Sequence, residues 1–254
     1  MATRKPRGGA TFTIGIVLYP DCDLLDVAGP NEVFTFFSGL PAGKGLTVTT
    51  IAAAKAAIPV IGALSVMPQH DFASAPRIDM LFVPGAGAGV AEALGDDRLL
   101  AFLARTGSRC RYVVSVCTGA LLLAAAGLLD GYQATTHWAV LEALRLFPKV
   151  SVVNGCPRYV VDRNRVSGGG ISSSIDESLF LVQLLAAAFT GDPAEGEAAA
   201  RAVQLMIQYH PQPPFAGGDP CSVDYATFAP VDAGMESFRA AVIAAVKARL
   251  AHHG

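Results

Sequence analysis

The cysteine at position 117 stands at a junction that favours nucleophilic chemistry. The β-branched segment 111–116 leads into Cys117, and the run of small and apolar residues from Gly119 predicts a helix almost directly after it. Such a strand-turn-helix junction holds a nucleophile in a strained, exposed position at the carboxyl edge of a parallel sheet, where ligands bind. The partial positive charge of the helix start predicts a thiolate of lowered pKa. The alternative is a buried structural cysteine that ends a strand.

Two carboxylates are candidates for the acid–base partner that a thiolate needs. Asp26 follows the first predicted strand among apolar neighbours, where it is either a buried general acid/base or a helix cap. Glu32 lies about one helical turn along and is the rival carboxylate. His137 either orients a partner of the cysteine or starts its own helix. The residues alone leave these alternatives open.

A glycine-containing loop at residues 84–87 follows another predicted core strand. Because the carboxyl ends of parallel strands meet at one edge of the sheet, we expect this loop to lie beside Cys117. We expect the backbone N–H groups of Gly85 and Ala86 to face the reaction centre, where they would hold developing negative charge. Any tight connection between a strand and a helix would also use such a loop.

The elements that must position these residues alternate along the chain. Short apolar runs predict buried strands, and segments with apolar residues at helical spacing predict helices between them. The main predicted strands cover residues 12–19, 46–52, 79–83 and 111–116, and the main predicted helices cover residues 30–37, 90–105, 176–189 and 235–250. This alternation indicates an α/β fold with a mainly parallel sheet.

Composition favours a globular protein that acts on small molecules. Hydrophobic residues make up 52% of the 254 residues and charged residues only 16%, which excludes intrinsic disorder. The 19 basic and 21 acidic side chains nearly cancel, so the charge does not point to a nucleic-acid partner. The five cysteines contain no CxxC pair and no zinc spacing. We therefore expect reduced cysteines, no metal site and no cofactor.

No linker or internal repeat divides the chain, so we expect a single domain over residues 11–254, with residues 230–254 as a C-terminal helical extension. Residues 1–10 are predicted to form a disordered basic tail, which lacks the apolar run of a signal peptide. The longest apolar stretch, residues 120–129, is about half of what a membrane span needs. We expect a cytoplasmic protein with no membrane partner.

Several short motifs occur together along the chain. They are LDVAGP at 25–30, VPG at 83–85, SVCTG at 115–119, AGLLDG at 126–131, ATTHW at 134–138 and SGGGI at 167–171. In content and order they resemble the ThiJ/PfpI superfamily, which is related to class I glutamine amidotransferases, and within it the isonitrile hydratases. The resemblance implies a flavodoxin-like sandwich, with a mainly parallel central sheet flanked by helices and an added C-terminal helix.

The resemblance also implies a role for individual residues. Cys117 matches the nucleophile, and Thr118 matches the residue whose backbone and hydroxyl help form the site. Asp26 matches the acid that replaces the superfamily's more usual Glu, which is a mark of the isonitrile hydratase subgroup. Gly85 matches the backbone-donor loop, with Ala86 where a second glycine is common. Members of the family are commonly homodimers.

The activity that the resemblance implies is that of a lyase, which adds water to an isonitrile and releases an N-substituted formamide. We expect the reaction to pass through a covalent thioimidate on Cys117, with Asp26 as the acid and then the base. One alternative is another small-molecule enzyme of the superfamily, glyoxalase-like or amidase-like. Another is a non-catalytic sensor domain related to AraC-type transcription regulators.

Overall fold

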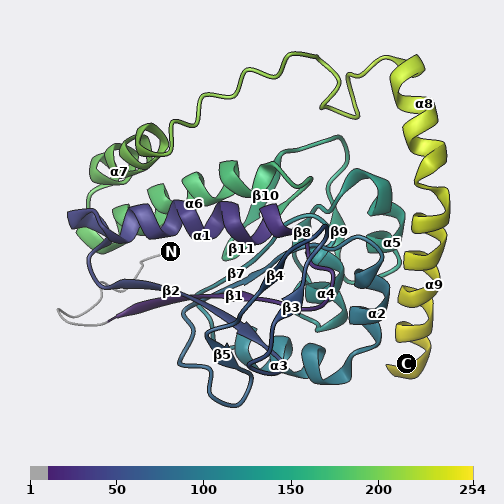
Figure 1. Cartoon of the computed structure of the whole chain (residues 1–254), viewed down its shortest axis with the longest axis horizontal. Coiled ribbons are helices and arrows are strands. Elements are labelled where there is room, and N and C mark those ends of the chain that lie inside the picture. The colour runs from purple at the N-terminus through teal and green to yellow at the C-terminus, as the bar shows by residue number, and fades with distance from the viewer. Residues whose placement is uncertain (1–10, 254) are drawn as a thin grey trace.

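The computed structural model describes residues 11–253. Within this part of the chain, the centre of the fold is a seven-stranded sheet (Figure 1). Neighbouring strands follow the order β10-β11-β7-β6-β1-β2-β5, and all pairs are parallel except β10 with β11. The strands are β1 (Phe12–Val17), β2 (Leu46–Ala52), β5 (His70–Asp71), β6 (Met80–Val83), β7 (Tyr112–Ser115), β10 (Tyr159–Asp162) and β11 (Arg165–Gly168). The predicted basic tail, residues 1–10, lies outside the described residues.

Two short strand pairs accompany the central sheet. Strand β3 (Ile58–Pro59) pairs antiparallel with β4 (Ser65–Val66), and β8 (Gln133–Ala134) pairs parallel with β9 (Ser151–Val152). The strands at the middle of the central sheet are buried on both faces, as all four residues of β6 show. Burial on both faces explains why their sequences are continuous apolar runs rather than alternating ones.

Helices cover both faces of the sheet (Figure 1). On one face lie α1 (Leu24–Ser38) and α6 (Ser173–Thr190), with α7 (Pro193–Met206) packed on both. On the other lie α3 (Asp97–Gly107) and α4 (Gly119–Ala125), with α2 (Gly89–Gly95), α5 (Leu141–Arg145) and α9 (Glu236–His253) packed around α4. The remaining helices are α8 (Tyr225–Gly234), η1 (Pro41–Gly43) and η2 (Trp138–Val140). The predicted flavodoxin-like sandwich is confirmed.

Helix α1 begins at Leu24, well before the predicted start at Pro30. The carboxylate of Asp23 caps it by accepting the N–H of Leu25. Pro30 lies inside the helix and is buried with its core-facing side chains. Proline removes one helical hydrogen bond, but packing of an apolar face stabilises a helix more than local propensity does. The prediction that this helix starts at Pro30 is therefore wrong.

Two other predicted boundaries also differ from the structure. The helix predicted over residues 90–105 is two helices, because Asp96 interrupts it and caps α3 by accepting the N–H groups of Arg98 and Leu99. The C-terminal helical part starts with α8 at Tyr225 rather than at residue 230. None of the described helices is both long and apolar enough to cross a membrane.

A disulfide joins Cys156 to Cys221 across 65 residues of sequence. The expectation of five reduced cysteines is therefore wrong, and the free thiols are those of Cys22, Cys110 and Cys117. Cys156 follows β9 and Cys221 lies in the long connection between α7 and α8, which Figure 1 shows crossing the outside of the molecule. Only the tertiary fold brings these two connections together, so no local spacing could reveal the pair.

This crosslink should contribute measurably to stability, because it restricts the unfolded chain. We expect Cys221→Ser to lose about 2–4 kcal/mol of unfolding free energy, which for a chain of this size lowers Tm by about 5–15 °C. Thermal unfolding followed by circular dichroism measures the change. A dithiol reductant should lower the Tm of the wild type to that of Cys221→Ser and leave the variant unchanged. A reductant-insensitive wild type would contradict the disulfide.

Candidate functional site

Cys117 occupies the predicted junction between strand β7 and helix α4. Its backbone φ is 55°, a left-handed conformation that costs energy in a residue with a side chain. Two hydrogen bonds hold it there, because its N–H donates to the Gly168 carbonyl at 3.1 Å and its carbonyl accepts the Thr136 hydroxyl at 2.8 Å. The strained junction is as predicted, but the side chain is only 6% exposed.

The loop at Gly85 passes directly against this cysteine. A Cβ atom at position 85 would stand 2.5 Å from the Cβ of Cys117 and 2.7 Å from the backbone nitrogen of Thr118. Atoms cannot approach that closely, so only glycine allows the loop to pass here. The expectation that this loop shares an edge of the sheet with Cys117 is met.

Asp26 is the carboxylate that the fold brings to the cysteine. It is 0% exposed, and its Oδ2 accepts the Gly85 N–H at 2.8 Å, while Oδ1 has no hydrogen-bond partner among the described residues. The same Oδ2 lies 3.0 Å from the point where a Gly85 Cβ would stand. Asp26 is thus a buried acid and not a helix cap, since Asp23 caps α1. Glu32, the rival, is exposed on α1, and neither carboxylate lines the cavity next to Cys117, so it is the contact with the Gly85 loop that distinguishes Asp26.

The two backbone donors predicted for the substrate are already used within the protein. The N–H of Gly85 donates to Asp26, and that of Ala86 donates to Oγ1 of Thr118 at 2.8 Å. The Thr118 hydroxyl in turn donates to the Ala86 carbonyl at 2.9 Å. The use of these N–H groups to hold negative charge on a substrate therefore stays a prediction. Their role in the structure is to fix the positions of Asp26 and Thr118.

Burial affects the protonation of both Cys117 and Asp26. Removal from water raises the pKa of the Cys117 thiol well above its usual value, and the nearby Asp26 charge raises it further, whereas the N–H of Thr118 lowers it. The predicted lowering by the helix start is thus outweighed. Burial also raises the pKa of Asp26, against the opposing effect of the Gly85 N–H. Two such neighbouring acids favour one shared negative charge over two.

Cys117 opens onto a cavity of about 180 Å³. The cavity is lined mainly by apolar groups, and its residues are Asp23, Ile61, Ala86, Gly87, Cys117, Thr118, His137, Ile171, Met235 and Phe238. Its apolar character suits an uncharged substrate.

His137 has one of the two roles that the sequence left open, that of starting a helix. Its Nδ1 accepts the N–H of Ala139 at 3.3 Å, so it caps η2, and its side chain also lines the cavity. Burial lowers its pKa, which keeps the ring neutral at physiological pH. A neutral ring adds no charge to the cavity.

Several residues at the site were not singled out from the sequence. Asp23 lines the cavity, and its place before an apolar helical run is the signal of an N-cap that could have identified it. Met235 lies between α8 and α9 and Phe238 lies in α9, and the pattern that predicted a helix over residues 235–250 did not show what this segment covers. These residues form part of the cavity wall next to Cys117.

Glu177 of α6 is a further buried carboxyl that sequence reasoning missed. It is 0% exposed, and neither carboxyl oxygen has a hydrogen-bond partner among the described residues. Its Oε2 lies 2.4 Å from the point where a Gly168 Cβ would stand. Burial and the Asp26 charge raise the pKa of Glu177 well above its usual value, which indicates a neutral carboxylic acid behind the site.

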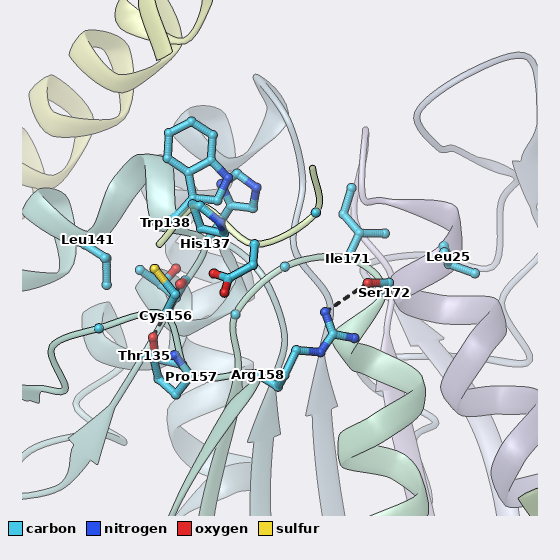
Figure 2. Close-up of a pocket in the computed structure, with 17 residues that line it drawn as sticks. Leu25, Thr135, His137, Trp138, Leu141, Cys156, Pro157, Arg158, Ile171 and Ser172 are labelled. Atoms are coloured by element: carbon cyan, nitrogen blue, oxygen red, sulfur yellow. Dashed lines mark hydrogen bonds between the residues drawn. The ribbon is translucent and has the colours of Figure 1, made fainter. Parts of the chain in front are cut away.

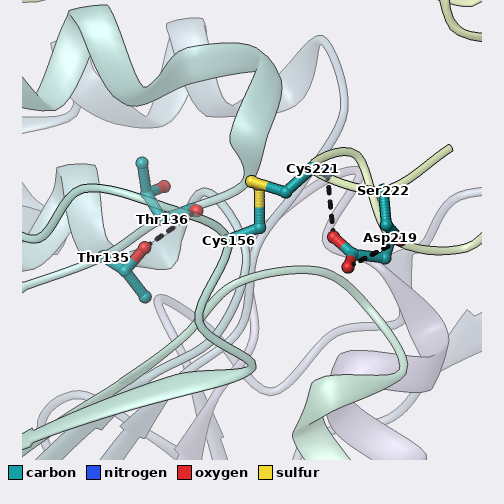
Figure 3. The surroundings of a disulfide bond; sticks show 6 residues. All are labelled: Thr135, Thr136, Cys156, Asp219, Cys221 and Ser222. Atoms are coloured by element: carbon teal, nitrogen blue, oxygen red, sulfur yellow. Dashed lines mark hydrogen bonds between the residues drawn. A yellow bond between two sulfur atoms is a disulfide. The ribbon is translucent and has the colours of Figure 1, made fainter.

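A second cavity, of about 440 Å³, has two lining residues in common with the first, and Figure 2 shows its lining. Its lining includes His137 and Ile171, which also line the cavity at Cys117. The other lining residues are Leu25, Thr135, Thr136, Trp138, Leu141, Gly155, Cys156, Pro157, Arg158, Gly169, Gly170, Ser172, Gly218, Asp219 and Pro220. The disulfide therefore lies at the edge of this cavity (Figure 3).

Among the described residues, the ligand atoms of Cys156, Asp219 and Cys221 are close enough together to hold a metal ion. The two sulfur atoms are bonded to each other, however, and a disulfide lacks the thiolates that bind metals. This group of residues is thus unsuited to a metal ion in the oxidised protein.

Comparison with known proteins agrees with this geometry. The DJ-1/PfpI family matches residues 13–185. The chain is 38% identical to "Isonitrile hydratase" of Pseudomonas putida over 221 residues, which are 86% of each protein. It is 28% identical to "HTH-type transcriptional regulator GbdR" of Pseudomonas aeruginosa over 70% of this chain, but it spans only 47% of that regulator.

A solved structure extends the likeness to most of the fold. The crystal structure of a ThiJ/PfpI family protein from Pseudomonas syringae has a TM-score of 0.81 and 30% sequence identity, and the match covers 93% of this chain and 91% of that one. The family match covers more than half of the sequence and includes the strand, loop and helix that position Cys117, Gly85 and Asp26. The chain belongs to the DJ-1/PfpI family.

Proposed function

We propose that this protein is an isonitrile hydratase, a lyase whose nucleophile is Cys117. The observation that carries the proposal is the juxtaposition of the Cys117 thiol and the Asp26 carboxyl around Gly85, with the sulfur open to an apolar cavity. The 38% identity to a protein named isonitrile hydratase supports the same activity. An isonitrile is uncharged and carries one reactive carbon, so it matches both the cavity and the nucleophile.

In the first step, Cys117 and Asp26 act together on that carbon. Asp26 takes the thiol proton, and the sulfur attacks the isonitrile carbon while the carboxylic acid returns the proton to the same carbon. A C–S bond and a C–H bond form, and the product is a thioimidate, R–N=CH–S, on Cys117. The oxygen Oδ1 of Asp26, which has no partner among the described residues, is the one we assign to this transfer.

In the second step, Asp26 acts as the base. It takes a proton from water as the hydroxyl adds to the thioimidate carbon, and it passes that proton to the substrate nitrogen. The tetrahedral intermediate then collapses. Its hydroxyl proton goes to Asp26, the C–S bond breaks, and the N-substituted formamide leaves. The sulfur and the carboxyl again hold one proton between them.

The similarity to a transcription regulator favours one other function, that of a sensor domain. The chain spans about half of that regulator's length, and the name transcriptional regulator describes the whole of that protein. A DNA mobility-shift assay separates the two proposals, and we expect no shift. A glyoxalase-like or amidase-like activity is tested by offering methylglyoxal and a simple amide beside the isonitriles.

Two further proposals concern the state of the protein in the cell. We infer a homodimer, which sedimentation equilibrium measures. We also infer a cytoplasmic location, where the Cys156–Cys221 disulfide would meet reductants that keep most protein thiols reduced. Thiol counting on protein from the cytosolic fraction tests the location and the redox state together.

Replacing the nucleophile should abolish hydration. We expect Cys117→Ala to reduce formamide production from benzyl isonitrile by about a thousandfold or more, because no other thiol lines the cavity. Formamide release is followed by chromatography, with Tm as the control for folding. Substantial turnover by a folded Cys117→Ala variant would show that the nucleophile is elsewhere.

Removing the Asp26 charge should affect hydration and thiol reactivity in opposite directions. We expect Asp26→Asn to lower kcat by about 10²–10⁴-fold, because no group then transfers the proton. The pKa of Cys117 should fall, since its charged neighbour is gone, so alkylation by iodoacetamide should begin at lower pH than in the wild type. Peptide mass spectrometry follows the labelling of Cys117.

Glu32→Gln is the matched control for this change, because it makes the same exchange on the exposed part of α1. We expect its kcat and its alkylation profile to equal those of the wild type. An Asp26→Asn variant with near-normal hydration, or an alkylation profile shifted to higher pH, would contradict the assignment of Asp26.

A further inference from the structure

The carboxylate of Asp23 is part of the wall of the cavity at Cys117, which is otherwise mainly apolar. The other carboxyls of the site, those of Asp26 and Glu177, are fully buried and do not line this cavity. Asp23 is only partly buried. It is therefore the acidic side chain that a molecule in the cavity can contact.

Two contacts of Asp23 fix its position beside the Gly85 loop. Its backbone N–H donates to the Gly85 carbonyl at 2.8 Å. Its Oδ1 accepts the N–H of Leu25 at 3.0 Å, which is the cap of α1. Its other carboxylate oxygen, Oδ2, makes no hydrogen bond to any residue that the structure describes. The carboxylate is thus held in place by the protein, and one of its two oxygens is left as an acceptor.

The other polar side chains of this wall are already engaged or can only donate. The hydroxyl of Thr118 accepts the Ala86 N–H and donates to the Ala86 carbonyl. The ring of His137 is neutral and its Nδ1 accepts the N–H of Ala139, so its proton is on Nε2, which can only donate. Oδ2 of Asp23 is therefore the side-chain acceptor that this wall leaves for a ligand.

An isonitrile group cannot use this acceptor. The group R–N≡C has no N–H or O–H, so it makes no hydrogen bond to a carboxylate. Water has two donors, and the proposed second step needs a water at the thioimidate carbon. The cavity of about 180 Å³ has room for it, because the share of one water in the liquid is about 30 Å³. Water is therefore the reactant whose chemistry matches Asp23.

Asp26 needs a second group to place this water. The proposed second step transfers a proton from the water to Asp26, but Asp26 is fully buried and does not line the cavity. A group on the cavity wall must hold the water against the carbon until that proton leaves. Asp23 lines the wall and is bonded to the same Gly85 loop that positions Asp26, so it meets this requirement.

We propose that Asp23 is a catalytic residue of the second step, in which its Oδ2 accepts a hydrogen bond from the water that attacks the thioimidate carbon. The inference rests on the proposed function. One proton of the water points to Asp23 and the other passes to Asp26, so the oxygen presents a lone pair to the carbon. Asp23 neither gains nor loses a proton. Its hydrogen bond stays on the hydroxyl of the tetrahedral intermediate until the intermediate collapses.

The same carboxylate opposes the first step. Burial is the main cause that raises the pKa of the Cys117 thiol, and the charges of Asp26 and Asp23 add to it. A higher thiol pKa makes the attacking thiolate harder to form. Asp23 should therefore slow the formation of the thioimidate and speed its hydration. A residue that only caps the helix would affect both steps in the same direction.

Asp23→Asn separates these effects, because asparagine caps a helix as well as aspartate does. Rapid mixing with benzyl isonitrile, acid quenching and peptide mass spectrometry measure how fast Cys117 is modified, and chromatography measures formamide release. We expect modification at least as fast as in the wild type, formamide release slowed about 10–100-fold, and accumulation of the thioimidate on Cys117. Asp23→Ser, which also keeps a cap, should behave in the same way.

Asp192→Asn is the matched control for these variants. Asp192 caps α7 by accepting the N–H of Ala194 at 2.9 Å, and it does not line the cavity at Cys117. The substitution removes the same charge from the same kind of cap, and we expect both steps to run as in the wild type. The Tm of each variant verifies that it is folded.

Formamide release at the wild-type rate by Asp23→Asn and Asp23→Ser would overturn the inference, and so would an equal slowing of both steps. With a wild type that hydrates the isonitrile, either result rejects the role of Asp23 and leaves the proposed hydratase in place. A wild type that produces no formamide from any isonitrile would reject the hydratase, and this inference with it.

Discussion

The absence of a side chain at Gly85 is the constraint on which the site depends. Atoms of Cys117, Thr118 and Asp26 lie between 2.5 and 3.0 Å from the position that a Cβ would occupy there, which is closer than van der Waals contact allows. The Gly85 N–H then positions the Asp26 carboxyl, and the next N–H positions Thr118. One close backbone approach thus brings together a thiol and an acid that lie far apart in the sequence, and it does so without a charged partner for either.

That arrangement concentrates buried acids in one place. Cys117, Asp26 and Glu177 are all shielded from water, and burial raises the pKa of each. A full thiolate in the resting protein would be costly, since its charge would add to that of Asp26. The chemistry proposed here avoids that cost, because one proton moves between sulfur, carboxyl and substrate while the site keeps one negative charge. An uncharged substrate with a protonatable carbon suits such a site.

The local sequence pattern was sufficient to predict the features that depend on consecutive residues. The strand entering Cys117, the turn and the following helix are consecutive in the chain, and the predicted sheet and its helical layers are confirmed. Asp26 could be named but not assigned between acid and cap, because the deciding contact is with Gly85, 59 residues away. The start of α1 was misplaced because Pro30 is a strong local signal, whereas the capping by Asp23 and the packing of α1 are what stabilise the helix.

Features that depend on the tertiary structure could not be predicted from the sequence. The direction of the Cys117 pKa shift depends on burial. The expectation of a lowered pKa considered only the partial positive charge at the start of the helix. The N–H groups of Gly85 and Ala86 were expected to be free, and their acceptors belong to distant segments. The disulfide joins two irregular connections, and the pattern that predicted the C-terminal helix gave no indication that Phe238 lines the cavity at Cys117.

The central claim is that the sulfur of Cys117 forms a covalent bond to the isonitrile carbon. Rapid acid quenching of the wild type during turnover of ¹³C-labelled benzyl isonitrile, followed by peptide mass spectrometry, tests it most directly. The account predicts a transient mass increase equal to one whole isonitrile on the peptide that contains Cys117, decaying as formamide appears. Steady formamide production with Cys117 unmodified at every time, or with the label on another residue, would contradict it.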